Sequence, residues 1–231
     1  MRILGLIPMR AGSKGIPGKN KKLLCGKPLM QYTIEAALAS QLLTDVVVST
    51  EDAELATLAT KLGAEVPFIR PARLAEDTTP SIDVVAHALE ALDDLYRNYN
   101  AVCLLQVTTP FRTAVHIDAA ITQFKNGTHE ALVSVQEVPH VYNPHWVFEK
   151  DKSGILRIAT GEATIISRRQ DLPKAYIRDG AIYITKTPTI LYRKTLLGSN
   201  LGCIELSDYN NVNLDTELDW AVAENHIHNF D

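Results

Sequence analysis

The sequence predicts an α/β protein with a mostly parallel, doubly wound sheet that is covered by helices on both faces. Short apolar runs alternate with longer stretches of helical periodicity along most of the chain. The first run, residues 3–8, is continuously apolar and ends at a proline, which is typical of a buried parallel strand. A second run, residues 45–50, contains three consecutive valines. We therefore expect strands that lie between two helical layers.

The alternation continues toward the C-terminus, and two residues mark helix boundaries. Pro28 suits a first helical turn, and Gly63 follows a helical stretch at a position where glycine commonly ends a helix. We expect further strands at residues 101–106, 131–135 and 181–185, and helices at residues 28–40, 51–62, 81–96, 113–124 and 215–228.

One stretch, residues 137–176, lacks this alternation. It contains Pro139, Pro144 and Pro173, short β-like pieces and no long helical pattern. We interpret it as a small arm inserted into a core formed by residues 1–136 and 177–231. Its aromatic side chains favour association with a second subunit.

The composition indicates a globular protein with a well-packed core: 46% of the 231 residues are hydrophobic and 22% are charged. The net charge of −4 argues against a nucleic-acid binder, which needs a basic surface. No apolar stretch approaches the roughly 20 residues of a membrane span. The three cysteines form no disulfide or zinc pattern, so we expect a cytoplasmic protein in which Cys103 and Cys203 are buried.

A basic, glycine-rich loop directly follows the first strand, where open α/β sheets bind ligands. Backbone N–H groups at glycines and nearby cations together suit a polyphosphate. The residues that supply them are Gly12, Gly15, Gly18, Arg10, Lys14 and Lys19. The loop is neither a P-loop, because five residues separate Gly12 from Gly18, nor a dinucleotide fingerprint, because its glycines are spaced Gly-x-x-Gly-x-x-Gly. The alternative is a surface loop with solvated lysines.

This loop and four later motifs, in order and across nearly the whole chain, resemble the acylneuraminate (CMP-sialic acid) cytidylyltransferases. The motifs are residues 10–20 with Gly26-Lys27-Pro28-Leu29, Arg70-Pro71 with Leu74-Ala75-Glu76-Asp77 and Ser81, residues 105–112, residues 168–173 with Gly180-Ala181-Ile182-Tyr183, and Asn213-Leu214-Asp215-Thr216 with Leu218-Asp219-Trp220. The resemblance implies a Rossmann-like nucleotidyltransferase fold.

The resemblance assigns the loop to the nucleotide. Arg10, Ser13 and Lys19 would hold the triphosphate of CTP, and Asn20 and the backbone near Ala11 would contact the cytidine. Fixed cations there would stabilise the charge that develops on the pyrophosphate leaving group. The implied catalytic residues are Arg10, Lys19 and Asp215, and the implied nucleotide-binding residues are Ala11, Gly12, Ser13, Lys14, Asn20, Arg70 and Ser81. Ser81 alternatively caps the helix that begins there.

The resemblance assigns Gln106, Arg168, Arg169 and Gln170 to the sugar substrate. Paired arginines suit a carboxylate, and the alternative is a surface pair that makes ordinary ion contacts. Gln106 alternatively forms hydrogen bonds within the core, and Arg112 either binds ligand or pairs with an acid. In the family, an arm of this kind completes the neighbouring subunit's site, which implies a homodimer.

The last motif departs from the family pattern, which has two aspartates at alternate positions. Here the pair is Asn213 and Asp215. Asparagine supplies a neutral oxygen, so we expect Asp215 to be the main protein carboxylate at a Mg²⁺ or Mn²⁺ ion, with Asn213 beside it. The alternative is that Asp215 caps the terminal helix.

The implied reaction transfers CMP from CTP to a nonulosonic, sialic-acid-type 2-keto-3-deoxy sugar acid and releases pyrophosphate. The residues leave neuraminate, legionaminate and related acids open, because these differ at C5 and C7 to C9. Three further functions stay open: a keto-deoxy-octulosonate cytidylyltransferase, a sugar-1-phosphate nucleotidyltransferase, and a non-catalytic nucleotide-binding protein.

Overall fold

The computed structural model describes residues 1–95, 97–206 and 211–228. These residues form two compact units: one comprises the described residues up to Ser134 together with those from Asp179 onward, and the other is Val135–Arg178. Tyr96, at the end of a predicted helix, lies outside the described residues, as do 207–210 and 229–231 of the predicted core.

A six-stranded sheet forms the centre of the first unit, with the strand order β10-β6-β9-β5-β1-β4. The strands are β1 (Ile3–Pro8), β4 (Asp45–Ser49), β5 (Ala101–Leu104), β6 (Ala131–Glu137), β9 (Tyr176–Lys186) and β10 (Leu201–Glu205). Strand β1 pairs in parallel with both β4 and β5, and these three strands are buried over almost their whole length. Their continuous apolar sequences follow from burial on both faces.

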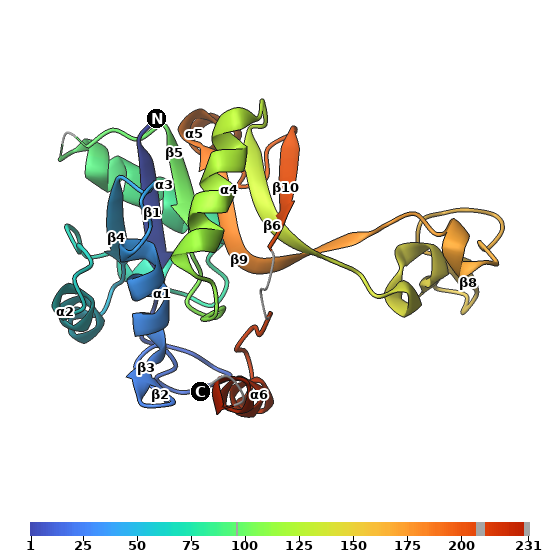
Figure 1. The fold of residues 1–231 in the computed structure, drawn as a ribbon, viewed down its shortest axis with the longest axis horizontal. Coiled ribbons are helices and arrows are strands. Elements are labelled where there is room, and N and C mark those ends of the chain that lie inside the picture. Colours follow the sequence, from blue (N-terminus) through green and yellow to red (C-terminus); the bar gives the residue numbers. More distant parts are fainter. Residues whose placement is uncertain (96, 207–210, 229–231) are drawn as a thin grey trace. The chain divides into compact units, whose positions relative to one another are not determined.

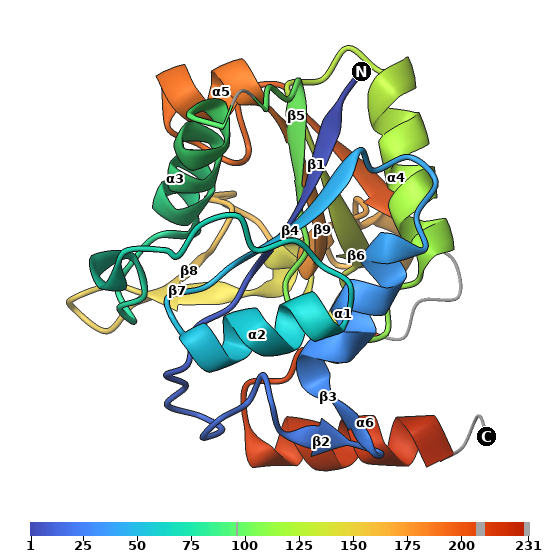
Figure 2. The same cartoon turned by 90° about the vertical axis from the view of Figure 1, so that its left-hand side faces the viewer.

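Helices cover both faces of this sheet, which confirms the predicted fold class (Figures 1 and 2). Figure 2 shows α1 and α4 on one face, and α3 with α5 on the other. Helix α2 packs beside α1. The helices are α1 (Leu29–Leu38), α2 (Ala53–Lys61), α3 (Ser81–Asp93), α4 (Ala114–Asn126), α5 (Thr187–Arg193) and α6 (Glu217–His228). Across the described residues, none of them has both the length and the hydrophobicity needed to cross a bilayer.

Local capping explains where two of these helices begin. The Asp52 carboxylate accepts a hydrogen bond from the Leu55 N–H at 2.7 Å, which satisfies a donor at the start of α2. Thr113 and His116 form a reciprocal capping box at the start of α4. Gly63 follows the C-cap of α2 with a φ of 95°, the left-handed conformation that glycine adopts without strain.

The second half of the sheet differs from the sequence expectation in detail. Strand β9 runs antiparallel to β5, and α5 and β10 were not predicted. An apolar run is equally compatible with both strand directions, so the sequence pattern carries no information on this point. The prediction that Cys203 is buried is wrong: it lies exposed on β10, at the edge of the sheet, whereas Cys103 on β5 is buried.

A small hairpin connects the glycine-rich loop to α1. Strand β2 (Leu23–Leu24) pairs antiparallel with β3 (Lys27–Pro28), and the two turn residues, Cys25 and Gly26, have φ values of 44° and 82°. Positive φ at both central residues is the type I′ geometry that suits two-residue hairpins. Helix α6 packs against β2, so the C-terminal helix lies next to this hairpin (Figure 2).

The second unit consists of short elements. Strands β7 (Phe148–Lys150) and β8 (Leu156–Ile158) form an antiparallel hairpin, and 3₁₀ turns lie at His140–Tyr142, Pro144–Trp146 and Arg169–Asp171. Two hydrogen bonds brace it: Asn143 donates to the Pro173 carbonyl at 2.9 Å, and Trp146 donates to the Ile166 carbonyl at 2.6 Å. Strands β6 and β9 lead from the first unit into this one.

Candidate active site

A cavity of about 380 Å³ lies in the first unit, at the carboxyl ends of β1 and β5. The glycine-rich loop, the segment around Arg70, the start of α3 and the segment after β5 all contribute to its wall. Predicted site residues that line it are Arg10, Gly12, Ser13, Lys19, Asn20, Arg70, Ser81, Gln106, Asn213 and Asp215. The structure therefore brings together motifs that are more than 200 residues apart in the sequence.

The predicted residues Ala11 and Lys14 belong to the same loop but are not among the lining residues. Arg168, Arg169 and Gln170 are exposed and belong to the second unit, where Arg168 pairs with Asp171 at 2.7 Å. Their assignment to the sugar stays a prediction.

The glycine-rich loop is anchored to the core by one apolar side chain. Ile16 is fully buried, and its carbonyl accepts a hydrogen bond from the Lys19 N–H at 3.2 Å. The Asn20 side chain is also nearly buried and donates to the Arg10 carbonyl at 2.8 Å, which closes the loop on itself. These two contacts shape the loop so that Arg10, Ser13 and Lys19 line the cavity.

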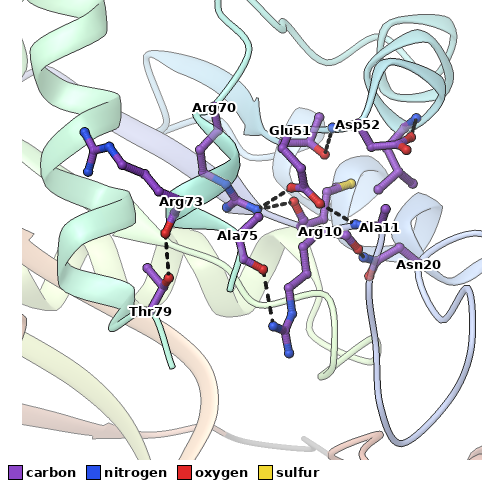
Figure 3. A network of polar contacts seen from close by, with 12 residues as sticks. Arg10, Ala11, Asn20, Glu51, Asp52, Arg70, Arg73, Ala75 and Thr79 are labelled. Atoms are coloured by element: carbon purple, nitrogen blue, oxygen red, sulfur yellow. Dashed lines mark hydrogen bonds and ion pairs between the residues drawn. The ribbon is translucent and has the colours of Figure 1, made fainter. Parts of the chain in front are cut away.

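Glu51, to which no sequence motif pointed, ties this loop to Arg70 (Figure 3). One Glu51 carboxylate oxygen accepts from the Ala11 N–H at 2.8 Å, and the other pairs with the Arg70 guanidinium at 2.8 Å. Arg70 also donates to the Met9 carbonyl at 2.8 Å. The signal that could have found Glu51 is its position just after β4, at the same sheet edge as the loop.

Arg70 is buried, with only 3% of its surface exposed. Its Nε has no hydrogen-bond partner among the described residues, whereas its Nη2 donates hydrogen bonds to both the Met9 carbonyl and the Glu51 carboxylate. A buried cation stays charged at least cost when a carboxylate lies beside it, and Glu51 fills that role here. Arg70 therefore places a buried guanidinium, paired with Glu51, at the wall of the cavity.

Asp77 lies between two loop cations. Its two oxygens pair with Arg10 at 2.6 Å and with Lys14 at 2.5 Å. Arg10 also donates to the Ala75 carbonyl at 3.4 Å (Figure 3). The hydrogen bond from Lys14, more than that from Arg10, lowers the pKa of Asp77 below its usual value, although partial desolvation opposes the change. Asp77 is thus an anion at neutral pH.

Two polar residues outside the glycine-rich loop, Ser81 and Gln106, also line the cavity. Ser81 is the first residue of α3, whose N-cap is Pro80 and has no side-chain cap bond, so the capping alternative for Ser81 finds no support. The Gln106 side chain lines the cavity close to Gly180. Arg112 is buried and donates to the Ala181 carbonyl at 2.8 Å, which makes it a structural brace behind this wall.

The segment with Asn213 and Asp215 is held by the residue between them. Leu214 is fully buried, and its N–H donates to the Thr108 carbonyl at 2.8 Å, so its two neighbours reach the cavity. Lys19 donates to the Leu214 carbonyl at 2.7 Å and lies 3.5 Å from the Asp215 carboxylate.

Gly15 allows the loop and this segment to touch. A Cβ at Gly15 would overlap the Asp215 carbonyl oxygen, so only glycine permits so close an approach.

Helix α6 is capped by residues other than Asp215. The Asp219 carboxylate accepts from the Thr216 N–H at 2.7 Å, and the Thr216 hydroxyl accepts from the Asp219 N–H at 3.3 Å. This reciprocal pair is a capping box, and the spacing Thr-x-x-Asp was visible in the sequence. The Asp215 carboxylate instead accepts from the Asn213 amide at 2.6 Å, so the capping alternative for Asp215 is wrong.

Comparison with known proteins decides the family. Residues 4–216 match the profile of the Cytidylyltransferase family, which covers most of the chain. The chain belongs to this family. It is 36% identical over 225 residues to a CMP-N,N'-diacetyllegionaminic acid synthase of Legionella pneumophila, covering 97% of this chain and 95% of that protein. It is also 31% identical to an N-acylneuraminate cytidylyltransferase of Escherichia coli, covering 96% of this chain and 51% of that protein.

The fold of this cytidylyltransferase is shared with a CMP:2-keto-3-deoxy-manno-octonic acid synthetase solved in complex with CTP. The TM-score is 0.74, the identity is 14%, and the match covers 100% of both chains.

The donor set at Asn213 and Asp215 fits a hard divalent cation only in part. A carboxylate and a carboxamide oxygen are ligands that Mg²⁺ and Mn²⁺ accept. Within the described parts of this cytidylyltransferase, however, no group of three or more His, Cys, Asp or Glu side chains could hold a metal ion. The residues therefore suit a cation that brings most of its ligands with it, as Mg²⁺ bound to nucleotide phosphates does.

Proposed function

We propose that this cytidylyltransferase transfers CMP from CTP to a nonulosonic, sialic-acid-type 2-keto-3-deoxy sugar acid. The single observation that carries the proposal is the cavity at the strand ends, where Arg10, Lys19, Gln106 and Asp215 converge. Relatives that span nearly the whole chain are named for such reactions, with legionaminic and neuraminic acids as acceptors. A pseudaminic acid cytidylyltransferase of Campylobacter jejuni is 35% identical over 183 residues.

In this reaction the C2 hydroxyl oxygen of the sugar acid attacks the α-phosphorus of CTP. A new phosphorus–oxygen bond forms, the bond from the α-phosphorus to the bridging oxygen breaks, and pyrophosphate leaves with the electron pair. The hydroxyl proton passes to solvent. Arg10 and Lys19 stabilise the negative charge that grows on the pyrophosphate.

Asp215, with the Asn213 carbonyl oxygen, would hold Mg²⁺ or Mn²⁺. The cation supplies charge neutralisation of the triphosphate when it is bound. Lys19 lies beside the Asp215 carboxylate and keeps this segment against the loop. Arg70 and Ser81 are proposed to contact the nucleotide, together with Asn20 and the loop backbone at Ala11, Gly12 and Ser13.

We further propose that the second unit mediates a homodimer and that Arg168, Arg169 and Gln170 bind the sugar acid's carboxylate. Paired guanidinium groups match a carboxylate, and these three residues are exposed. Large apolar side chains are also exposed in this unit: Val141, Tyr142, Val147, Phe148, Ile155, Leu156, Ile165, Tyr176 and Ile177. An exposed apolar surface of this kind is typical of an association site.

An acceptor panel tests the proposed activity. The purified protein is incubated with CTP, Mg²⁺ and either N-acetylneuraminate, a legionaminate, a pseudaminate, the eight-carbon keto-deoxy acid or a hexose 1-phosphate, and released pyrophosphate is measured. We expect release with at least one nonulosonic acid and much less with the last two acceptors. Equal use of a hexose 1-phosphate, or no release with any keto-deoxy acid, would show that the proposal is wrong.

A further inference from the structure

We propose that Asp77 is an internal counter-ion of the triphosphate site: it holds Arg10 and Lys14 while the site is empty, and the phosphates of CTP displace it. The proposal rests on the proposed function, because it assumes that this loop receives a polyphosphate. It assigns to Asp77 the role of a competing anion, which weakens the binding of the nucleotide and of pyrophosphate.

The geometry places Asp77 on the same cations that a phosphate would use. Its two carboxylate oxygens are divided between Arg10 and Lys14, at 2.6 and 2.5 Å, so both cations are engaged at once. Asp77 and Arg10 also line the cavity together. A phosphate oxygen that reached the Arg10 guanidinium from the cavity would therefore lie close to the Asp77 carboxylate.

The Asp77 carboxylate and the phosphates of CTP compete for Arg10 and Lys14, because both are negatively charged. Asp77 is negative at neutral pH, as an aspartate ordinarily is, and the bond from Lys14 and the neighbouring Arg10 lower its pKa further. A nucleoside triphosphate brings several negative charges of its own. Two anions that share one guanidinium repel each other, so CTP binds well only after the carboxylate has moved away.

Asp77 is able to move because it is partly in water. Its side chain is 36% exposed and Lys14 is 84% exposed, and exposed ion pairs contribute little to stability. Its backbone lies in a turn between the 3₁₀ segment Ala72–Leu74 and α3, where the Thr79 N–H donates to the Glu76 carbonyl at 3.1 Å. The pair is therefore a reversible contact, in contrast to the buried pair of Arg70 with Glu51.

The counter-ion has a consequence for turnover. After the transfer, pyrophosphate remains on the loop cations, and its charge would hold it there. Asp77 competes for Arg10 and Lys14 and so favours release of this product. Removal of the carboxylate should strengthen the binding of both CTP and pyrophosphate, and it should make pyrophosphate a stronger inhibitor.

Binding measurements on Asp77→Asn and Asp77→Ala test this proposal, with calorimetric titration of Mg²⁺–pyrophosphate and Mg²⁺–CTP into the intact protein. We expect the Kd of each ligand to fall roughly threefold to tenfold, because up to two exposed ion pairs no longer compete. The two variants differ in side-chain size but lose the same charge, so agreement between them assigns the effect to charge.

The matched control is Glu76→Gln. Glu76 lines the same cavity and carries the same charge, but its carboxylate forms no ion pair within the described chain. This variant should tighten binding by less than half as much as Asp77→Asn. An equal gain in both variants would indicate a general field effect and overturn the role of Asp77.

Unchanged or weaker pyrophosphate binding in the Asp77 variants would also overturn the proposal. Weaker binding would mean that Asp77 orients Arg10 for the ligand. Pyrophosphate binding does not depend on the sugar acceptor. A wild-type protein that turns over no acceptor would contradict the proposed function alone, while the comparison of variants would still decide the role of Asp77.

Discussion

At the scale of single residues, each loop cation that lines the cavity has an acidic neighbour. Arg10 pairs with Asp77, and Lys19 lies beside Asp215. The loop composition alone predicted a basic site, because glycines and cations are local in sequence. Glu51 and Asp77 could not be predicted in these roles, since they are 40 and 67 residues from their loop partners Ala11 and Arg10 and the fold alone brings them there.

Removal of either cation tests the phosphate site. Arg10→Ala and Lys19→Ala should each lower kcat/KM by about 100-fold or more, as expected when a charge contact in the transition state is lost. Both proteins should remain folded, which circular dichroism can check. Lys21→Ala is the control, because Lys21 pairs with Glu54 and does not line the cavity, and its kinetics should stay near normal. Normal kinetics in both loop variants would contradict the assignment.

At the scale of elements, strands and helices with strong periodicity were predictable. Strands β1 and β4 and helices α1 to α4 lie close to where apolar spacing placed them. Helix α5 was missed because it is only seven residues long, although Pro188 in its first turn is a start signal. Strand β10 was missed because its exposure alternates and it lies at a sheet edge, where fewer apolar residues are needed.

Variants of Asp215 and Asp219, near the start of α6, should distinguish metal binding from helix capping. Asp215→Asn should leave the melting temperature almost unchanged, lower kcat sharply and raise the Mg²⁺ concentration for half-maximal rate. Asp219→Ala should lower Tm by about 2–4 °C, because a helix cap contributes about 1 kcal/mol. Its carboxylate also accepts from the Asp215 N–H at 3.1 Å, so its Mg²⁺ requirement should rise much less than that of Asp215→Asn rather than stay the same. Normal turnover of Asp215→Asn at low Mg²⁺ would place the metal elsewhere.

The cap should also respond to pH in a defined direction. Hydrogen bonds from the Thr216 hydroxyl and N–H lower the pKa of Asp219 in the folded protein. A carboxylate with a lowered folded pKa contributes its full stability above its usual pKa, and the contribution disappears as the pH falls through the folded value. The Tm difference between wild type and Asp219→Ala should therefore be constant near neutral pH and shrink in acid. A difference that grows in acid would be inconsistent with this cap.

At the scale of the whole molecule, the chain combines a first unit that contains the cavity with a second unit that exposes apolar side chains. The irregular sequence of residues 137–176 indicated an insert, but no local pattern specified its hairpin or its turns. The role that we propose for this insert depends on a second subunit. From the sequence of one chain, the only indication of this association is the set of apolar residues in the insert, which stay exposed in the single subunit.

Light scattering at micromolar concentration should report a dimer. Leu156→Asp should weaken it, because Leu156 is 60% exposed on β8 and a charge in an apolar interface is costly to desolvate. The monomeric variant should keep CTP binding in the first unit and lose turnover with the sugar acid. A wild-type monomer with full activity would contradict both the dimer and the shared sugar site.

The most direct test of the central claim is the donor specificity of the reaction. Wild-type protein is incubated with a nonulosonic acid, Mg²⁺ and either CTP, ATP or GTP, and the nucleotide–sugar product is identified by mass spectrometry. We expect a CMP–sugar conjugate and one pyrophosphate per conjugate with CTP, and far less product with ATP or GTP. Equal products from all three nucleotides, or pyrophosphate release without a conjugate, would contradict the claim.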